Sequence, residues 1–106
     1  DHQTVGLVCR VVEEAGVPTV CVSTGRDITA LVRPPRSYFV NAPMGNNFGA
    51  AGDVATQSRI LRAVLALAVE ARDPGLILDD VLQWPAPFAF NPAPATPEAI
   101  AKQLRK

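Results

Sequence analysis

The sequence is poor in cysteine and histidine and has no excess of charge of either sign. Its 106 residues include two cysteines and one histidine, which are too few and too widely separated for a zinc site or a disulfide framework. Ten basic residues balance ten acidic ones, so the chain lacks the positive excess that attracts nucleic acid or an anionic membrane. These absences indicate that its partners are small molecules or other protein chains.

Long apolar runs are also missing, and this bears on where the protein resides. Arg59, Arg62, Glu70 and Arg72 interrupt the longest apolar-periodic stretch, and no run approaches the roughly 20 apolar residues that a membrane span needs. We expect a soluble, cytoplasmic protein in a reducing compartment, because its two cysteines do not make a stabilising framework. Since the chain begins at Asp1 without a leader sequence, we also expect that it was processed or cut from a longer chain.

The apolar residues that are present suffice for one small domain, and their spacing predicts two helices. The chain is 48% hydrophobic, which is enough for a single core. Apolar side chains recur three and four positions apart over residues 4–15, with Thr4 as the expected cap and Gly16 as the expected end. Asp53 is expected to cap a second helix over residues 54–72. The side chains expected on the buried faces are Val5, Leu7, Val8, Val11, Val12 and Ala15 in the first helix, and Ile60, Leu61, Val64, Leu65, Leu67, Ala68 and Ala71 in the second.

Two short segments rich in β-branched and aromatic residues predict strands. Residues 17–23 (VPTVCVS) and 37–43 (SYFVNAP) are too short for helices, and the first is apolar on both faces, as buried parallel strands are. Between them we expect a loop with one or two helical turns, capped by Asp27 and ending before Pro34. The order of elements predicts an α/β fold with a small, partly parallel open sheet and helices on its faces. Because two strands are not enough, we expect a further strand from an upstream segment or a partner chain.

The composition changes after this α/β domain, which we place at residues 1–73. Residues 74–106 are rich in proline and include Trp84, Phe88 and Phe90. Proline cannot join a central strand ladder, so no sheet strands are expected in this arm. The arm either packs back over its own domain or, through residues 74–97, embraces another chain in a homo- or hetero-oligomer. Thr96 and Pro97 predict a short closing helix.

A glycine-rich loop, GNNFGAAG at residues 45–52, lies between the second strand and the second long helix. Its glycine spacing matches neither common phosphate-binding motif, no lysine follows, and the Asp53 cap would compete with a bound phosphate. In one interpretation the glycines only permit positive φ in a sharp turn. In the other, Gly45, Asn46 and Asn47 bind a neutral polar substrate at the carboxyl end of a strand, where open α/β sheets hold their ligands.

The residues ahead of the first helix suggest acid and base chemistry. Asp1 adjoins His2, the single histidine, and Thr4 follows; a histidine titrates near neutrality and needs an orienting partner. A helix N-terminus disfavours the imidazolium ion, so a neutral His2 would act as a base or hydrogen-bond donor. The alternative is that these side chains are solvated surface groups.

Cys9 and Cys21 also have two interpretations. They occupy apolar positions inside a predicted helix and a predicted strand, where a cysteine usually acts as a small buried hydrophobe. The alternative is a redox role, although a reactive thiolate favours a helix N-terminus or cationic neighbours.

The first two thirds of the chain is similar to a known family. The run DHQTVGLVCRVVEEAGVPTVCVS, then DITALVRPPRSYFVNAPMG and the helix with QSRILRAVLAL, resembles the selenoprotein B family of glycine, sarcosine, betaine and D-proline reductases, in particular its shorter, mostly selenium-free relatives. The resemblance implies an α/β domain. In active members it also implies reductive cleavage of a carbon–nitrogen bond by a selenol or thiol at the start of the helix that here begins near Thr4. The matching positions here, residues 1–4, hold neither cysteine nor selenocysteine.

Two functions follow as hypotheses. The chain is a subunit or fragment of a reductase-like enzyme for a small amine or amino-acid-like substrate, with a site formed by Asp1, His2, Thr4 and Cys9 as catalytic residues and by the 45–47 loop as the binding segment. Alternatively, it is a non-catalytic subunit that completes a partner's sheet and wraps it with the arm. The first hypothesis requires that His2 and Asn46 lie at the same edge of the sheet. The sequence identifies no cofactor.

Overall fold

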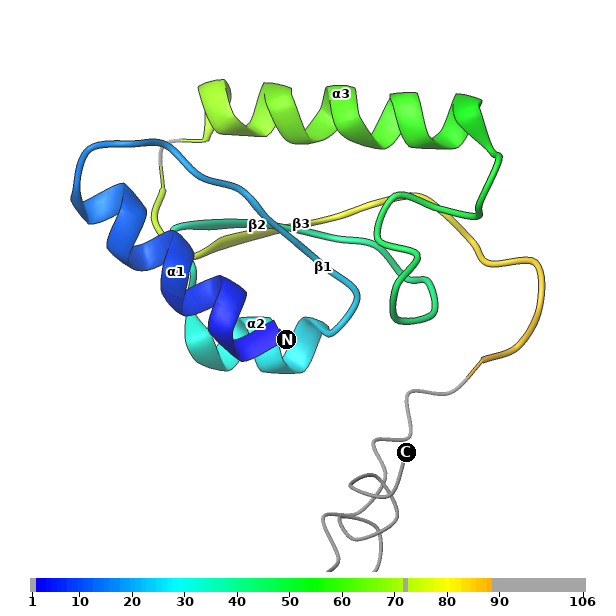
Figure 1. The fold of residues 1–106 in the computed structure, drawn as a ribbon, viewed down its shortest axis with the longest axis horizontal. Coiled ribbons are helices and arrows are strands. Elements are labelled where there is room, and N and C mark those ends of the chain that lie inside the picture. The colour runs from blue at the N-terminus through cyan, green and yellow to red at the C-terminus, as the bar shows by residue number, and fades with distance from the viewer. Residues whose placement is uncertain (1, 72, 89–106) are drawn as a thin grey trace, which may run out of the picture.

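The structure is a computed structural model that describes residues 2–71 and 73–88. Helices and strands alternate along the chain (Figure 1). The elements are α1 (His2–Glu14), β1 (Cys21–Ser23), α2 (Arg26–Val32), β2 (Arg36–Phe39), α3 (Val54–Glu70) and β3 (Leu76–Asp79). The sequence-based prediction of a small α/β fold with an open sheet is confirmed.

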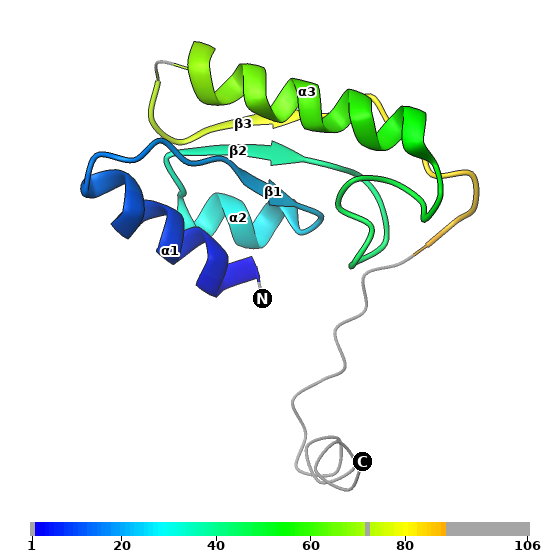
Figure 2. The same ribbon diagram turned by 45° about the horizontal axis from the view of Figure 1, so that its top comes forward.

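The three strands form one parallel sheet in the order β1-β2-β3. The register places Cys21 opposite Ser37 and Ser37 opposite Ile77. Figures 1 and 2 show α3 along one face of the sheet and α1 and α2 along the other. The two outer strands, β1 and β3, each have one edge that pairs with no other strand of the described residues.

The two connections between neighbouring strands have opposite hands. Both step in the same direction across the sheet, from β1 to β2 and from β2 to β3. They pass over opposite faces, because α2 and α3 cover opposite faces (Figure 2). Since crossovers between parallel strands are right-handed in nearly all proteins, one of the two connections is exceptional.

The helix α1 begins earlier than predicted and is mostly exposed. It starts at His2, so Thr4 lies in its first turn and is not its cap. Its end is as predicted, since Gly16 has a φ of 100°, in the left-handed region that favours glycine. The buried residues of α1 are Gly6 and Cys9.

The apolar stripe predicted to be buried in α1 is therefore wrong for most of its members. The exposed fractions of Val5, Leu7, Val8 and Val11 are 43–66%. The physical reason is that the helix contacts α2 and β1 along a narrow strip, and no other described segment covers the rest. The periodicity identified side chains that share a face without showing that anything lies against that face.

The short helix α2 has a cap other than the one predicted. It begins at Arg26, after Gly25, so Asp27 lies inside the first turn. The helix ends at Val32, and its C-cap residue, Arg33, adopts a left-handed φ of 55° before the buried Pro34. The predicted stop before Pro34 is confirmed.

The helix α3 supplies most of the core. Asp53 caps it by accepting a hydrogen bond from the Thr56 N–H at 3.2 Å, as predicted. The core residues are Ile60, Val64 and Leu67 from α3 with Tyr38, Val40 and Ala42 from β2 and the segment after it. Leu61 and Leu65, predicted to be buried, are 47% and 59% exposed, because they lie on the side of α3 that faces away from the sheet.

The strand β3 was not predicted. It lies in the segment assigned to the proline-rich arm, so the expectation that this segment holds no sheet strand is wrong for residues 76–79. The run LILD contains no proline, because the nearest prolines, Pro74 and Pro85, lie outside it. All four of its residues therefore keep a backbone N–H, and the run pairs with β2. Further along, Trp84 packs against the domain's own core and contacts Phe88 edge to face, with ring centroids 6.5 Å apart. The predicted closing helix and Phe90 lie outside the described residues.

In the part of the chain that the structure describes, no helix is both long and apolar enough to cross a membrane.

Candidate functional site

The carboxyl ends of the parallel strands meet at one edge of the sheet, and α1 begins there (Figure 1). His2 is half-buried, and its Nε2 lies 3.2 Å from Thr24 Oγ1, directly after β1. Whether Nε2 donates or accepts depends on the imidazole tautomer. The ring also lies close against Gly25, because a Cβ built on that glycine would be 3.1 Å from His2 Cδ2. The backbone after β1 thus holds the imidazole in place.

Two hydroxyls fix the turn that holds His2. Ser23 Oγ accepts a hydrogen bond from the Gly25 N–H at 2.9 Å and another from Thr29 Oγ1 at 2.7 Å. Both hydroxyl-bearing residues are buried. A side chain at position 25 would crowd the imidazole, which would have to shift by a few tenths of an ångström, so this turn and His2 pack closely together.

The glycine-rich loop reaches the same end of β1. Asn47 Nδ2 donates a hydrogen bond to the Val22 carbonyl at 3.0 Å. Asn46 uses its backbone, with its N–H bonded to Pro43 O at 3.0 Å and its carbonyl accepting from the Gly49 N–H at 2.9 Å. Its half-buried side-chain amide has no hydrogen-bond partner among the described residues. The loop therefore leaves one asparagine side chain available to a ligand.

The glycines of this loop have a conformational role. Gly45, Gly49 and Gly52 all have positive φ, between 79° and 96°, where other residues are strained. A Cβ at Gly49 would also lie 2.8 Å from Thr56 Cγ2. These glycines shape the turn, and the asparagines between them supply its polar side chains.

The start of α3 is closed to a phosphate. The Asp53 carboxylate accepts the Thr56 N–H, and this hydrogen bond lowers the pKa of Asp53, so the group remains an anion at neutral pH. A second anion at the same helix end is disfavoured. The charge arrangement therefore favours a ligand that is neutral or zwitterionic over a nucleotide.

The remaining predicted site residues are not gathered at this edge. Thr4 is exposed in the first turn of α1, and Asp1 lies outside the described residues. Cys9 is buried, and its carbonyl oxygen lies 3.4 Å from Thr19 Oγ1, ahead of β1. Because Cys9 lies near the start of β1 and His2 near its end, Cys9 does not join His2 and Asn47.

A charged network that was not predicted from the sequence begins directly after β3. The Asp80 carboxylate is fully buried. It accepts two hydrogen bonds from Arg59, at 2.7 and 3.0 Å, one from the Leu82 N–H at 2.9 Å, and one from the Tyr38 hydroxyl. Burial alone would raise the pKa of Asp80, but the hydrogen bonds from Arg59, Tyr38 and Leu82 outweigh it and lower that pKa to about 2. Burial and the neighbouring Asp80 carboxylate raise the pKa of Tyr38 to about 12.

A second missed contact spans the same edge on the outside. Arg26, the first residue of α2, bonds both oxygens of Asp79 at 2.8 and 3.4 Å, with both side chains about half exposed. The signal for both contacts was the LILDD run, in which two acidic residues end an apolar strand. Because the strand was not recognised, the acidic residues could not be placed.

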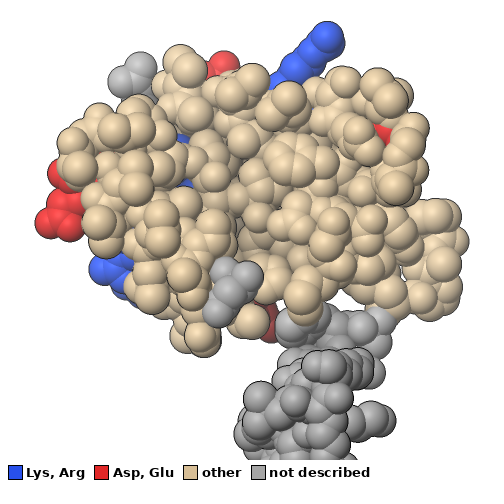
Figure 3. Space-filling model, viewed as in Figure 1, with Lys and Arg blue, Asp and Glu red and all other residues tan. Residues whose placement is uncertain are grey.

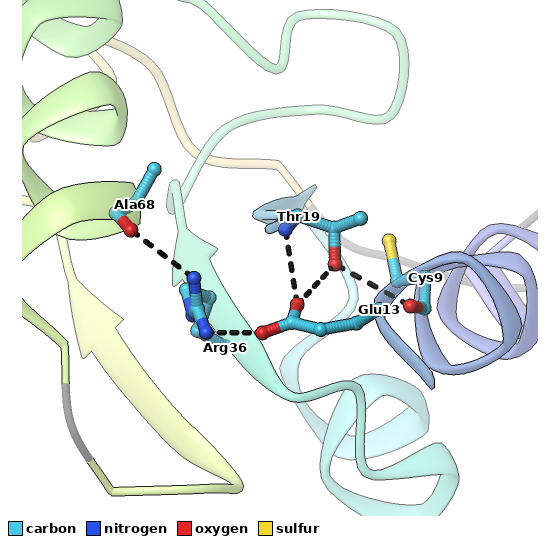
Figure 4. Close-up of polar contacts among 5 residues, drawn as sticks. All are labelled: Cys9, Glu13, Thr19, Arg36 and Ala68. Carbon is cyan, nitrogen blue, oxygen red and sulfur yellow. Dashed lines mark hydrogen bonds and ion pairs between the residues drawn. The ribbon is translucent and has the colours of Figure 1, made fainter. Parts of the chain in front are cut away.

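The amino edge carries a structural network instead (Figure 4). Arg36, at the start of β2, pairs with Glu13 in the last turn of α1 and donates to the Ala68 carbonyl of α3 at 3.1 Å. Glu13 also accepts hydrogen bonds from the Thr19 N–H at 3.0 Å and from Thr19 Oγ1 at 2.8 Å. One arginine thus joins the helices that cover opposite faces of the sheet.

Two adjoining hollows lie at this amino edge, away from His2 and Asn47. The smaller, of about 310 Å³, lies between α2 and the Pro74–Gly75 turn, and the larger, of about 640 Å³, is lined by residues of α1 and by the same turn. Arg33 lines both. Its side chain makes no hydrogen bond or ion pair with the described residues.

The arrangement at the carboxyl edge combines one imidazole, one hydroxyl at Thr24 and one available amide. These groups can exchange a proton and hold a small polar molecule by hydrogen bonds. Among the described residues no group of three or more His, Cys, Asp or Glu side chains could bind a metal ion. No family model, no curated protein and no solved structure matches this chain.

Proposed function

We propose that this chain is one subunit of a reductase-like enzyme and that it binds a small amine or amino-acid-like substrate at the carboxyl edge of its sheet. The observation that supports this most is that two segments far apart in the sequence meet at β1. His2 lies within hydrogen-bond distance of Thr24, directly after the strand, and Asn47 donates to the Val22 carbonyl within it. Open parallel sheets bind ligands at this edge. The resemblance to the selenoprotein B family suggests the reaction class.

Each side chain of the proposed site would have its own role in such a reaction. Reductive cleavage of a carbon–nitrogen bond consumes two electrons and delivers protons to the carbon and to the departing amine. Neutral His2, beside Thr24, donates a hydrogen bond to the amine nitrogen, the Asn46 amide holds the polar end of the substrate, and the protons come from solvent. Residues 2–4 contain no thiol, so in this proposal another subunit supplies the electrons.

Isothermal titration of the chain with glycine, sarcosine, betaine and D-proline tests the proposal. We expect one of them to bind with a dissociation constant between about 1 μM and 1 mM, the usual range for enzyme substrates. Asn46→Ala removes one hydrogen bond and should weaken that binding about tenfold. Asn41→Ala, a change at an exposed asparagine shortly before the loop, is the matched control. Equal weakening by both variants, or no binding of any of the four, would count against the site.

A second function, a non-catalytic subunit that completes the sheet of another chain, is favoured by a separate observation. Four apolar side chains of α1 are 43–66% exposed, and Figure 3 shows few charged side chains on the face seen there. Patches of this kind mark protein interfaces. β1 and β3 also offer free backbone edges to a further strand.

Sedimentation of the isolated chain distinguishes this second function. If the α1 face binds another chain, Val11→Glu should make the protein more monomeric and more soluble, because a charge on the patch opposes its burial. Glu14→Gln, at an exposed position one turn away, is the control. A chain that is monomeric at high concentration without either change would oppose self-association through α1 and leave only a different partner chain.

A further inference from the structure

Two buried thiols from different elements meet beneath α1. Cys9, on the buried strip of α1, is 7% exposed, and Cys21, the first residue of β1, is 1% exposed. Cys21 lies on the face of the sheet that α1 and α2 cover, because the side chain of Ser23, two residues further along β1, bonds Thr29 of α2. Cys9 is near enough to contribute, after burial, to the raised pKa of Cys21. Thr19, two residues before Cys21, also places this segment against α1, because its Oγ1 lies 3.4 Å from the Cys9 carbonyl oxygen.

The surroundings of the pair suit a dithiol that reacts only when it is exposed. A buried thiol is protected from solution, and burial raises the pKa of Cys21 to about 11, so this thiol seldom ionises in the closed fold. The helix α1, which covers Cys21, packs weakly against the rest of the domain, since only its residues Gly6 and Cys9 are buried. Local separation of α1 from the sheet therefore uncovers both thiols at a modest free-energy cost.

One buried hydroxyl, that of Ser37, lies next to the pair. Ser37 lies opposite Cys21 on β2, and its Oγ is fully buried without a hydrogen-bond partner among the described residues. Buried polar atoms are normally paired. During thiol–disulfide exchange a negative charge develops on the Cys21 sulfur. That sulfur would then accept a hydrogen bond from the Ser37 hydroxyl.

We propose that Cys9 and Cys21 form a redox-active dithiol that closes to an intramolecular disulfide by reducing a small disulfide molecule. In the first step the Cys9 thiolate attacks one sulfur of the small disulfide, forms a mixed disulfide and releases one small thiolate. Cys21 then loses its proton to solvent and attacks the Cys9 sulfur, which expels the second small thiolate. Two protein thiols are oxidised, and one small disulfide is reduced to two thiols. Cys9 attacks first because it is carried on α1, the element that separates from the sheet, whereas Cys21 stays in β1.

The consequence for the fold is a covalent link between α1 and β1. In the reduced chain the helix is held by a narrow strip of contacts, and in the oxidised chain it is tethered at Cys9. Since His2 lies at the start of the same helix, the redox state of the pair also sets how firmly the imidazole is held. The dithiol itself does not depend on the ligand site proposed above.

Equilibration of the reduced chain with oxidised and reduced glutathione, followed by acid quenching and peptide mapping by mass spectrometry, tests the inference. We expect a Cys9–Cys21 disulfide whose equilibrium constant is at least about tenfold higher in the native chain than in concentrated guanidinium, because the fold holds the two sulfurs together. A ratio near one, or oxidation that yields only glutathione adducts or links between chains, would overturn it.

Two single variants separate the steps. Cys21→Ser should accumulate the glutathione adduct on Cys9, and Cys9→Ser should lose at least nine tenths of the initial reactivity of the wild-type chain. Rapid reaction of Cys9→Ser at Cys21 would contradict the order of attack. If either variant fails to fold, as circular dichroism would show, the comparison of native and denatured wild-type chain still decides the inference.

Discussion

At the scale of the residue, Asp80 is a carboxylate whose side chain is shielded from water. Its carboxylate is fully buried and accepts hydrogen bonds from Arg59, Tyr38 and a backbone N–H. These contacts join β2, α3 and the end of β3. Removing the charge leaves the donors without an ionised acceptor, which in proteins costs on the order of 1–3 kcal/mol.

We therefore expect Asp80→Asn to lower the free energy of unfolding by about 2 kcal/mol, as measured by urea denaturation. The loss should depend on pH. The pKa of Asp80 in the folded chain, about 2, lies below the ordinary value of about 3.9 for an unfolded chain. The ionised carboxylate thus stabilises the fold above about pH 4, and this contribution disappears as the pH falls toward about 2.

The control for this prediction is Asp73→Asn, since Asp73 is exposed. It should change the free energy of unfolding by less than about 0.5 kcal/mol. If the two variants have equal stability at neutral pH, or if Asp80→Asn keeps the acid dependence of the wild type, the network does not hold α3 to the sheet.

Arg33 has an unusual backbone conformation for a residue with a side chain, because its φ is left-handed, at 55°. This conformation costs an L-residue about 1–2 kcal/mol and costs glycine almost nothing. We expect Arg33→Gly to raise the free energy of unfolding by about 1 kcal/mol, after allowance for the greater freedom of glycine in the unfolded chain. Arg33→Ala, which keeps the strain, should not stabilise. A destabilised glycine variant in thermal unfolding would mean that the arginine side chain itself holds the turn.

At the scale of the element, α1 is defined by how little of it is buried. Gly6 is buried against the end of α2, since a Cβ there would lie 2.7 Å from Val32 Cγ1 and 3.3 Å from Pro34 Cγ. Valine is stiff at χ1 and cannot move aside easily. The helix and α2 can therefore approach one another only because position 6 has no side chain.

Gly6→Ala should separate α1 from α2. Alanine favours a helix by about 1 kcal/mol over glycine, but overpacking of this kind costs about 1–3 kcal/mol, so we expect a small net loss of stability. Hydrogen exchange should show faster exchange of the α1 amides while those of α3 keep their protection. Glu14→Ala, at an exposed position of the same helix, serves as the control. Unchanged exchange in Gly6→Ala would show that the two helices are not held by this contact.

The elements also show what the sequence could and could not predict. The cap at Asp53, the end of α1 at Gly16 and the stop before Pro34 depend on neighbouring residues, and all three were predicted. The strand β3 was missed because prolines surround a four-residue run, LILD, whose partner is β2. The exposure of Leu7 and Val11 could not be predicted, because periodicity shows which side chains share a face and not what covers it.

At the scale of the whole molecule, the open parallel sheet with helices on its faces followed from the order of the elements. The face of the sheet that each helix covers could not be predicted from that order. α2 and α3 lie on opposite faces because of long-range packing, which local sequence patterns do not show. The meeting of His2 with Thr24 and of Asn47 with Val22 is likewise a result of folding. The sequence supplied the candidate side chains, and the parallel sheet brings two of them to one edge.

The most direct test of this account is a nuclear magnetic resonance titration of the ¹⁵N-labelled chain with glycine, sarcosine, betaine and D-proline. We expect one of these molecules to shift the backbone amides of His2, Thr24, Asn46 and Asn47 together, with a single dissociation constant, while the amides around Arg33 at the opposite edge stay unchanged. Shifts confined to the hollows at the amino edge, or none with any of the four molecules, would contradict it.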